Sequence, residues 1–119
     1  QLLSLIRETC TNLTSLNLGG NQIHLPIATF SKTLARFQIR SLELADSEIF
    51  GAVSDIVTLS QLSKLNLRNT KVEGALSDIA ILTNLSWLSL KNTKVEGALS
   101  DIATLTNLSM LDVSNTKVE

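Results

Sequence analysis

A 23-residue segment occurs twice in direct succession at the C-terminal end of the chain. Residues 74–96, GALSDIAILTNLSWLSLKNTKVE, return as residues 97–119 with changes at only five positions. Self-similarity at a fixed period is typical of repeat architectures, in which each unit buries its apolar edge only against its neighbours. The sequence therefore predicts a stack of similar coils.

The repeated unit has a regular apolar pattern. Apolar residues stand at positions i, i+3, i+5 and i+10 and a small polar residue at i+8, and the pattern fits five times, with starts 26, 23, 23 and 23 residues apart. The five units begin at Leu13, Ile39, Leu62, Leu85 and Leu108. Alternation at i+3 and i+5 predicts short strands with one buried face. Because successive strands enter from the same direction, we expect them to pair in parallel.

The segments between the strands should close the core on its far side. Gly51, Gly74 and Gly97 recur where the backbone must turn tightly or adopt a positive φ. Three aspartates also recur, one in each return, and they predict caps for a single helical or 3₁₀ turn. They are Asp55, Asp78 and Asp101. The first return differs: apolar spacings of three and four between His24 and Phe37 predict a helix opened by Pro26, and residues 2–10 predict another helix.

The unbroken row L-x-x-L-x-L-x-x-N-x-I from Leu13 to Ile23 resembles the leucine-rich repeat, and the resemblance covers nearly the whole chain. The return V-x-G-x-L is similar to the plant-specific variety, although Leu-Ser-Asp stands where that variety has Ile-Pro. This resemblance implies an α/β right-handed solenoid with a concave parallel sheet and short helical, 3₁₀ or irregular convex returns. It also implies a non-catalytic scaffold that binds a protein or peptide partner on its concave face, without a cofactor.

We expect one array over residues 1–119. Residues 1–12 would end a preceding repeat, residues 13–38, 39–61, 62–84 and 85–107 would be full repeats, and residues 108–119 a partial one. Since the array stops within a unit, we expect a piece of a longer protein that is less stable alone than in its parent.

Position i+8 departs from the resemblance, which implies an Asn ladder there. Only Asn21 keeps the amide, and hydroxyls replace it in the later coils. They are Ser47, Thr70, Thr93 and Thr116. A hydroxyl has one donor where an amide has two. We expect Asn69, Asn92 and Asn115, or ordered water, to make some of the missing hydrogen bonds.

Strand alternation also predicts which side chains face outward on the concave surface. They stand at i+2, i+4 and i+6 of each unit, on strands about 4.8 Å apart. The predicted partner-binding residues on this map are Lys64, Arg68, Trp87, Lys91, Met110 and Asp112. Trp87 should face outward with Lys64 over its ring, and exposed Trp and Met beside cations are typical interface anchors. The alternative is that Trp87 only covers the edges of core leucines.

Sequence variation between units falls on the same face. Three of the five changes replace Trp87 by Met110, Ser89 by Asp112 and Lys91 by Ser114. Selection for recognition would produce this pattern, and so would drift at unconstrained positions. Recognition is favoured because the equally exposed column of Lys71, Lys94 and Lys117 did not change.

Composition excludes several other functions. A net charge of −1, from ten basic and eleven acidic side chains, argues against nucleic-acid binding. No apolar run is long enough for membrane insertion. His24 and Cys10 are the only residues of their kinds, so neither a catalytic set nor an internal disulfide is expected. One carboxylate per coil is too few for a metal site. Compartment and oligomeric state stay open.

Two other functions remain as alternatives. The array could be a targeting or regulatory segment of a larger receptor, kinase or ligase. It could instead be a structural, adhesive or ice-binding surface built on the column of Thr70, Thr93 and Thr116. The glycosylation sequons at Asn12, Asn84 and Asn107 discriminate little, because the repeat pattern TNLS or TNLT spells them automatically.

Overall fold

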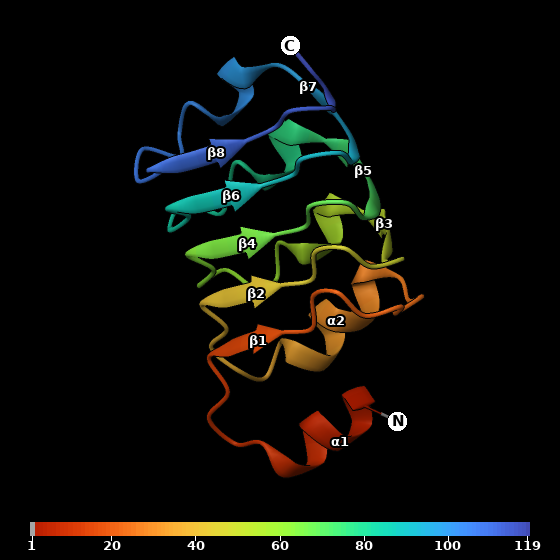
Figure 1. Cartoon of the computed structure of the whole chain (residues 1–119). Coiled ribbons are helices and arrows are strands. Elements are labelled where there is room, and N and C mark those ends of the chain that lie inside the picture. Colours follow the sequence, from red (N-terminus) through yellow and green to blue (C-terminus); the bar gives the residue numbers. More distant parts are fainter. Residues whose placement is uncertain (1) are drawn as a thin grey trace.

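The computed structural model describes residues 2–119, which form an elongated solenoid of stacked coils measuring 41 × 26 × 19 Å (Figure 1). Helix α1 (Leu2–Thr9) lies at the N-terminal end, and α2 (Ile27–Leu34) is the return of the first coil. Pro26 is the N-cap of α2. Both helices predicted from apolar spacing are therefore present, and later returns contain only single 3₁₀ turns.

One face of the solenoid is a five-stranded parallel sheet. Its strands, in spatial order, are β1 (Ser15–Asn17), β2 (Ser41–Glu43), β4 (Lys64–Asn66), β6 (Trp87–Ser89) and β8 (Met110–Asp112). Equivalent residues of neighbouring coils pair, as in Leu42 with Leu65 and Leu65 with Leu88. The predicted parallel pairing and the predicted strand phase are both confirmed.

A second parallel sheet was not predicted from the sequence. It joins β3 (Phe50–Ala52), β5 (Lys71–Ala75), β7 (Lys94–Gly97) and β9 (Lys117–Val118), all in the segments that follow the first sheet. Residues that pair in this sheet are not equivalent positions of two repeats but differ by two positions. Val72 thus pairs with Gly51, and Val95 with Gly74. The same offset pairs Glu73 with Lys94 rather than Lys71 with Lys94. Opposite charges, not stacked like charges, therefore neighbour each other along this edge.

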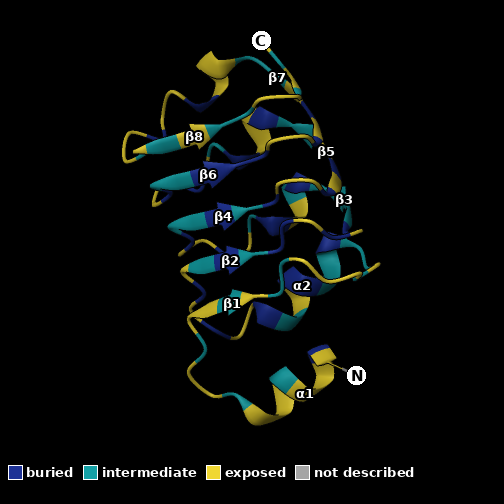
Figure 2. Ribbon diagram, in the orientation of Figure 1, coloured by how far each residue is buried: buried dark blue, intermediate teal, exposed yellow. Residues whose placement is uncertain are grey.

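The core fills the space between the two sheets and the returns (Figure 2). Six leucines from strands β2, β4 and β6 and the positions just after them are fully buried. They are Leu42, Leu44, Leu65, Leu67, Leu88 and Leu90. On the return side Ile56 and Ile79 are fully buried as well, in the 3₁₀ turns Val53–Ile56 and Leu76–Ile79. The middle coils thus bury apolar side chains from both of their walls, whereas Leu111 in the last coil is 38% exposed.

The predicted aspartate caps are only partly right. Each aspartate is the third residue of its 3₁₀ turn, and an alanine holds the N-cap position. The Asp101 carboxylate accepts a hydrogen bond from the Ala98 N–H at 3.0 Å, in the turn Leu99–Ile102. Asp55 and Asp78 make no such bond in the described part of the chain. The carboxylate therefore caps by reaching back three residues, and only one of the three copies does so.

The hydroxyl column at i+8 points into the protein. Thr70 and Thr93 are 5% and 7% exposed, and their hydroxyls donate to the carbonyls of Leu67 and Leu90, both at 2.7 Å. Ser47 and Thr116 bond the equivalent carbonyls of Leu44 and Val113. Because these hydroxyls are buried and engaged, the interpretation of the threonine column as an ice-binding surface is wrong.

A separate ladder of polar side chains runs one residue earlier, as expected. Asn92 Nδ2 donates to Asn69 Oδ1 at 2.8 Å, and Asn69 Nδ2 donates to Asp46 Oδ1 at 2.6 Å. Asp46, Asn69, Asn92 and Asn115 all have positive φ, between 54° and 58°. Asn and Asp tolerate this left-handed conformation better than other residues with a Cβ. These residues therefore both turn the chain and connect successive coils.

Candidate partner-binding face

The C-terminal half of the five-stranded sheet, from the central strand β4 to the edge strand β8, brings three predicted site residues into one row. Lys64 pairs with Trp87 and Trp87 with Met110, so their side chains stand on adjacent strands on the outer side of the sheet. Trp87 and Met110 are half-buried. The Lys64 Nζ lies 4.8 Å from the centre of the Trp87 ring, within cation–π range. Trp87 thus presents part of its ring to solvent beside an ammonium group.

Glu43, which the sequence analysis did not single out, holds Lys64 in this position. The Lys64 Nζ lies 3.3 Å from Glu43 Oε1, and the Lys64 side chain is 39% exposed. Asn17 Nδ2 also donates to Glu43 Oε2 at 2.9 Å. The network links three strands and restricts the rotamers of Lys64. Glu43 stands at i+4 of its unit and Lys64 at i+2 of the next unit, so the two are diagonal neighbours on adjacent strands. This spacing is the sequence signal from which their contact could have been predicted.

Arg68 is tied to the edge of the sheet by Asp46. Its Nη2 lies 3.2 Å from Asp46 Oδ2, and both side chains are nearly half exposed. Hydrogen bonds from Asn69 and then from Arg68 lower the pKa of the Asp46 carboxyl below its ordinary value. The carboxylate therefore stays ionised through the neutral range and keeps the guanidinium on this edge.

The last two predicted residues differ in how they are held. Lys91 is exposed and makes no ion pair within residues 2–119. Asp112 accepts hydrogen bonds from the Ser114 hydroxyl at 2.6 Å and the Ser114 N–H at 3.0 Å. These bonds, and then the charges of Lys91 and Arg68, lower the pKa of Asp112. Lys91 is therefore the cation of this face most available to a partner.

Two outward positions on this face do not present side chains to solvent. Ala45 is 6% and Ser89 is 3% exposed, although strand alternation puts both on the outer surface. A hollow of about 310 Å³ lies at the N-terminal part of the face. Its lining residues are Asn17, Gly19, Gly20, Glu43, Ala45, Asp46, Asn66 and Arg68. Gly19, Gly20 and Ala45 are the small residues that line this polar hollow.

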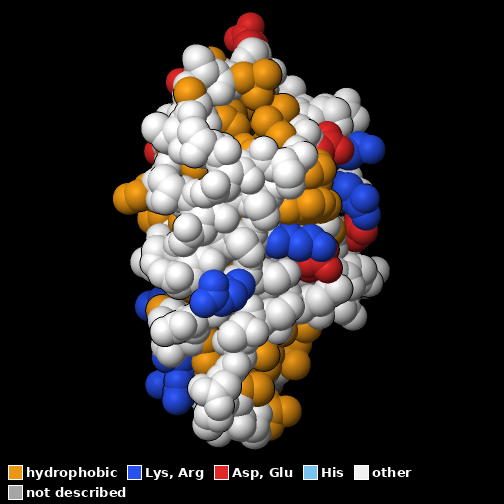
Figure 3. Space-filling view, turned by 90° about the vertical axis from the view of Figure 1, so that its left-hand side faces the viewer, with side chains coloured by type: hydrophobic (Ala, Val, Ile, Leu, Met, Phe, Trp, Pro, Cys, Tyr) orange, Lys and Arg blue, Asp and Glu red, His pale blue; other side chains and the backbone are white. Residues whose placement is uncertain are grey.

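The surface chemistry along one side of the solenoid is mixed (Figure 3). Hydrophobic side chains gather immediately above basic and acidic side chains that lie against each other. Such a mixture of an apolar anchor with a charged rim is typical of protein interfaces. We call the set Lys64, Arg68, Trp87, Lys91, Met110 and Asp112 the concave patch.

Residues 2–119 contain no group of three His, Cys, Asp or Glu side chains placed to hold a metal ion. Neither α1 nor α2 has the length and apolar character to cross a membrane, and these are the α-helices of the described part.

Comparisons with known proteins agree with the coil geometry. The sequence profile described as Leucine Rich Repeat matches residues 12–33. The ectodomain of the receptor kinase SOBIR1 from Arabidopsis thaliana is similar in structure, with a TM-score of 0.75 and 26% identity, over 89% of this chain and 58% of that one. A chain of the BIR3–SERK2 complex from Arabidopsis thaliana has a TM-score of 0.72 and 26% identity, over 92% of this chain and 58% of that one.

A bacterial protein is similar to the same extent. An internalin from Listeria monocytogenes has a TM-score of 0.73 and 25% identity, over 90% of this chain and 29% of that one. A comparison with curated protein sequences gave no significant match. The five repeat rows, the parallel sheet, the match over residues 12–33 and these likenesses together support the leucine-rich repeat family and show its solenoid fold. It spans less than two thirds of the length of each of these structures.

Proposed function

We propose that this chain is a non-catalytic scaffold that binds a protein or peptide partner through the concave patch. The observation that carries the proposal is the half-buried Trp87 ring on β6, which lies between Met110 and the Lys64 ammonium on the neighbouring strands. A tryptophan fixed by its neighbours loses little conformational entropy on binding. Aromatic residues of this kind carry a large share of the free energy at protein interfaces.

The likenesses support a binding role in general terms. One of the similar structures is a chain of a complex between two proteins, BIR3 and SERK2. Another is the ectodomain of a receptor kinase. The charges of the patch favour a partner that sets an apolar side chain against Trp87 and a carboxylate against Lys91, because Lys64 and Arg68 already have carboxylate neighbours.

A selection from a random peptide library displayed on phage tests this proposal. Binders selected on the native chain should lose at least about tenfold in affinity for Trp87→Ala, in line with about 1.4 kcal/mol or more for an interface anchor. Ile81→Ala is the matched control, since Ile81 is 70% exposed and lies outside the concave sheet. Equal affinity for the native chain and Trp87→Ala across independent binders would exclude the concave patch as the docking surface.

The second candidate is a regulatory or targeting segment of a larger receptor, kinase or ligase. The likeness to a receptor-kinase ectodomain is the observation that favours it. This candidate uses the same binding surface, and the sequence of the full reading frame discriminates between the two by the presence or absence of a catalytic domain.

A further inference from the structure

The basic side chains of this protein are unevenly distributed. Four of the ten Lys and Arg residues but only one of the eleven Asp and Glu residues lie within residues 1–40. The first coil is therefore cationic, although the chain as a whole has a net charge of −1. The remaining coils carry the acidic excess. This asymmetry concentrates positive potential at one end of the solenoid.

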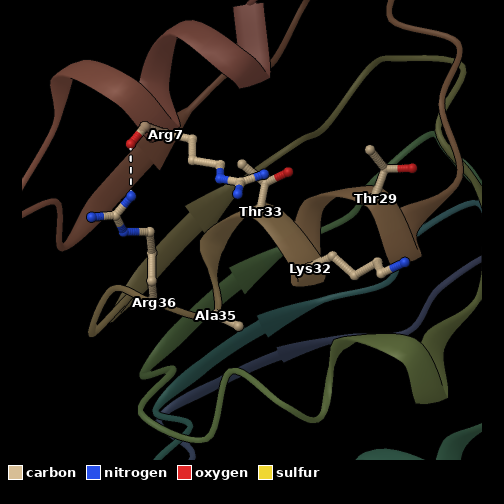
Figure 4. Close-up of a pocket in the computed structure, with 6 residues that line it drawn as sticks. All are labelled: Arg7, Thr29, Lys32, Thr33, Ala35 and Arg36. Carbon is tan, nitrogen blue, oxygen red and sulfur yellow. Dashed lines mark hydrogen bonds between the residues drawn. The ribbon is translucent and has the colours of Figure 1, made fainter.

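Three of these four cations line one hollow between α1 and α2 (Figure 4). The hollow has a volume of about 840 Å³, and its lining residues are Arg7, Thr29, Lys32, Thr33, Ala35 and Arg36. Residues 29, 32 and 33 follow the spacing that puts side chains on one face of α2, and Arg36 lies in the turn that follows this helix. In Figure 4 the Arg7 side chain extends from α1 toward Thr33. No carboxylate is among the lining residues. We call this hollow the basic hollow.

Arg36 is held in place without losing its charge. Its Nη1 donates to the Arg7 carbonyl at 2.8 Å, and its guanidinium lies 5.4 Å from the centre of the Phe37 ring. The Arg7 carbonyl belongs to the last turn of α1, where carbonyls lack partners within the helix. This bond uses one of five N–H donors of the guanidinium. Arg36 thus ties the two helices together and keeps donors for a ligand.

The cations of the basic hollow differ from the three ion-paired cations of the later coils. Lys64, Arg68 and Lys71 each lie within 3.3 Å of a carboxylate oxygen. Arg7, Lys32 and Arg36 make no ion pair with any residue in the range 2–119. In Figure 3, likewise, some basic side chains stand apart from acidic ones while others touch them. Three unpaired cations in one hollow repel each other unless an anion lies between them.

We propose that the basic hollow binds a phosphate or sulfate ester group. Guanidinium groups match the oxygen atoms of such groups with paired donors, and Lys32 supplies a third positive charge. The hydroxyls of Thr29 and Thr33 add neutral donors on the same helix face. The lining donors come from α1 on one side and from α2 and the turn after it on the other. A tetrahedral oxyanion suits this arrangement, because its oxygen atoms accept hydrogen bonds from several directions. The site is independent of the concave patch, because the two share no residue.

Nuclear magnetic resonance titrations of the ¹⁵N-labelled chain test the proposal. The probes are phenyl phosphate, phenyl sulfate and benzoate, each added at constant ionic strength. The two esters should shift the amide signals of residues 29–36 in a saturable way, and benzoate should bind several-fold more weakly. At pH 7.5 phenyl phosphate carries nearly two charges and phenyl sulfate one. Tighter binding of phenyl phosphate assigns the site to phosphate esters, and affinity for phenyl sulfate that is equal or higher assigns it to sulfate esters.

Arg7→Gln and Lys32→Gln should each weaken ester binding about threefold to tenfold, as expected for one exposed charge-assisted contact. Neither change removes the Arg36 bond, which uses only the main-chain carbonyl of residue 7. Lys94→Gln is the matched control, because Lys94 is an exposed lysine on β7. Benzoate binding as tight as the esters, unchanged affinity in both variants, or an equal loss in Lys94→Gln would each overturn the proposal.

Discussion

At the scale of single residues, the recurring glycines are the positions where this backbone is least tolerant. Gly74 has φ of 118°, a region that side chains rarely adopt, and it pairs with Val95 of the next coil. A Cβ at Gly74 would lie 3.3 Å from Val53 Cγ2. The glycine is therefore required both by its backbone conformation and by the close approach of two coils.

Gly74→Ala should lower the free energy of unfolding by about 2 kcal/mol, because strain in this φ region adds to the close contact. Urea denaturation followed by circular dichroism measures the change. Gly20→Asn is the control: Gly20 has φ of 76° and open space around its Cβ position, and Asn tolerates that conformation. The interpretation fails if Gly20→Asn destabilises the chain as much as Gly74→Ala.

A second prediction at the residue scale concerns the buried hydroxyl column. Thr93→Val keeps the side-chain shape but leaves the Leu90 carbonyl without its partner at 2.7 Å. A buried carbonyl that loses its hydrogen bond costs about 1–3 kcal/mol. The same denaturation measurement should show that loss for Thr93→Val and almost none for Thr83→Val, because Thr83 is exposed. Similar stabilities of the two variants would mean that the hydroxyl bond does not matter.

At the scale of elements, the turn ladder connects coils that the sheets already pair. Asp46 accepts hydrogen bonds from Asn69 and Arg68, both of the following coil. Because the folded-state pKa of Asp46 is lowered, the unfolded chain binds more protons as the pH approaches the ordinary value for aspartate. The stabilisation is therefore complete at neutral pH and is lost as the pH falls below about 4.

Asp46→Asn should make the stability of the chain depend less steeply on pH below about 4, since the asparagine has no charge to lose. The test compares urea midpoints of the native chain and the variant at neutral pH and in acid. Glu48 and Asp112 also have lowered pKa values, so part of the acid dependence must remain. An unchanged pH dependence in Asp46→Asn would show that this carboxylate does not link folding to protonation.

At the scale of the whole molecule, stability should increase with the number of coils. Each coil contacts its neighbours through both sheets, as in the pairs β4 with β6 and β5 with β7. In such arrays the free energy is close to a sum of unit terms and nearest-neighbour interface terms. No long-range tertiary contact outside this stacking is needed.

Duplicating residues 74–96 directly after Glu96 adds one coil with the same interfaces. The longer chain should have a higher free energy of unfolding and a larger urea m-value, because more surface is buried. An insertion of the same 23 residues in scrambled order is the control, since it keeps composition and loses the apolar spacing. Equal stability of the two insertions would contradict the nearest-neighbour description.

The sequence by itself determined the repeat, the phase of the first sheet and the residues that face outward from it. Apolar spacing has a period of two in strands, and a slip by one residue would expose the leucines, so these features follow from local pattern. Apolar spacings of three and four located both helices, and the recurrence of Gly51, Gly74 and Gly97 located these three glycines with positive φ. The strand phase alone therefore predicts that Lys64, Trp87 and Met110 lie in one row, as their pairing shows.

Only the tertiary structure decided the features that depend on how one coil lies on the next. The second sheet was missed because its register is offset by two residues, and this offset sets Val72 and Val95 each against a glycine of the preceding coil. The role of Glu43, the burial of Ser89 and the basic hollow all depend on side chains of separate coils or helices meeting in space. Apolar periodicity along one chain carries no information about such contacts, because they are set by the stagger and packing of neighbouring elements.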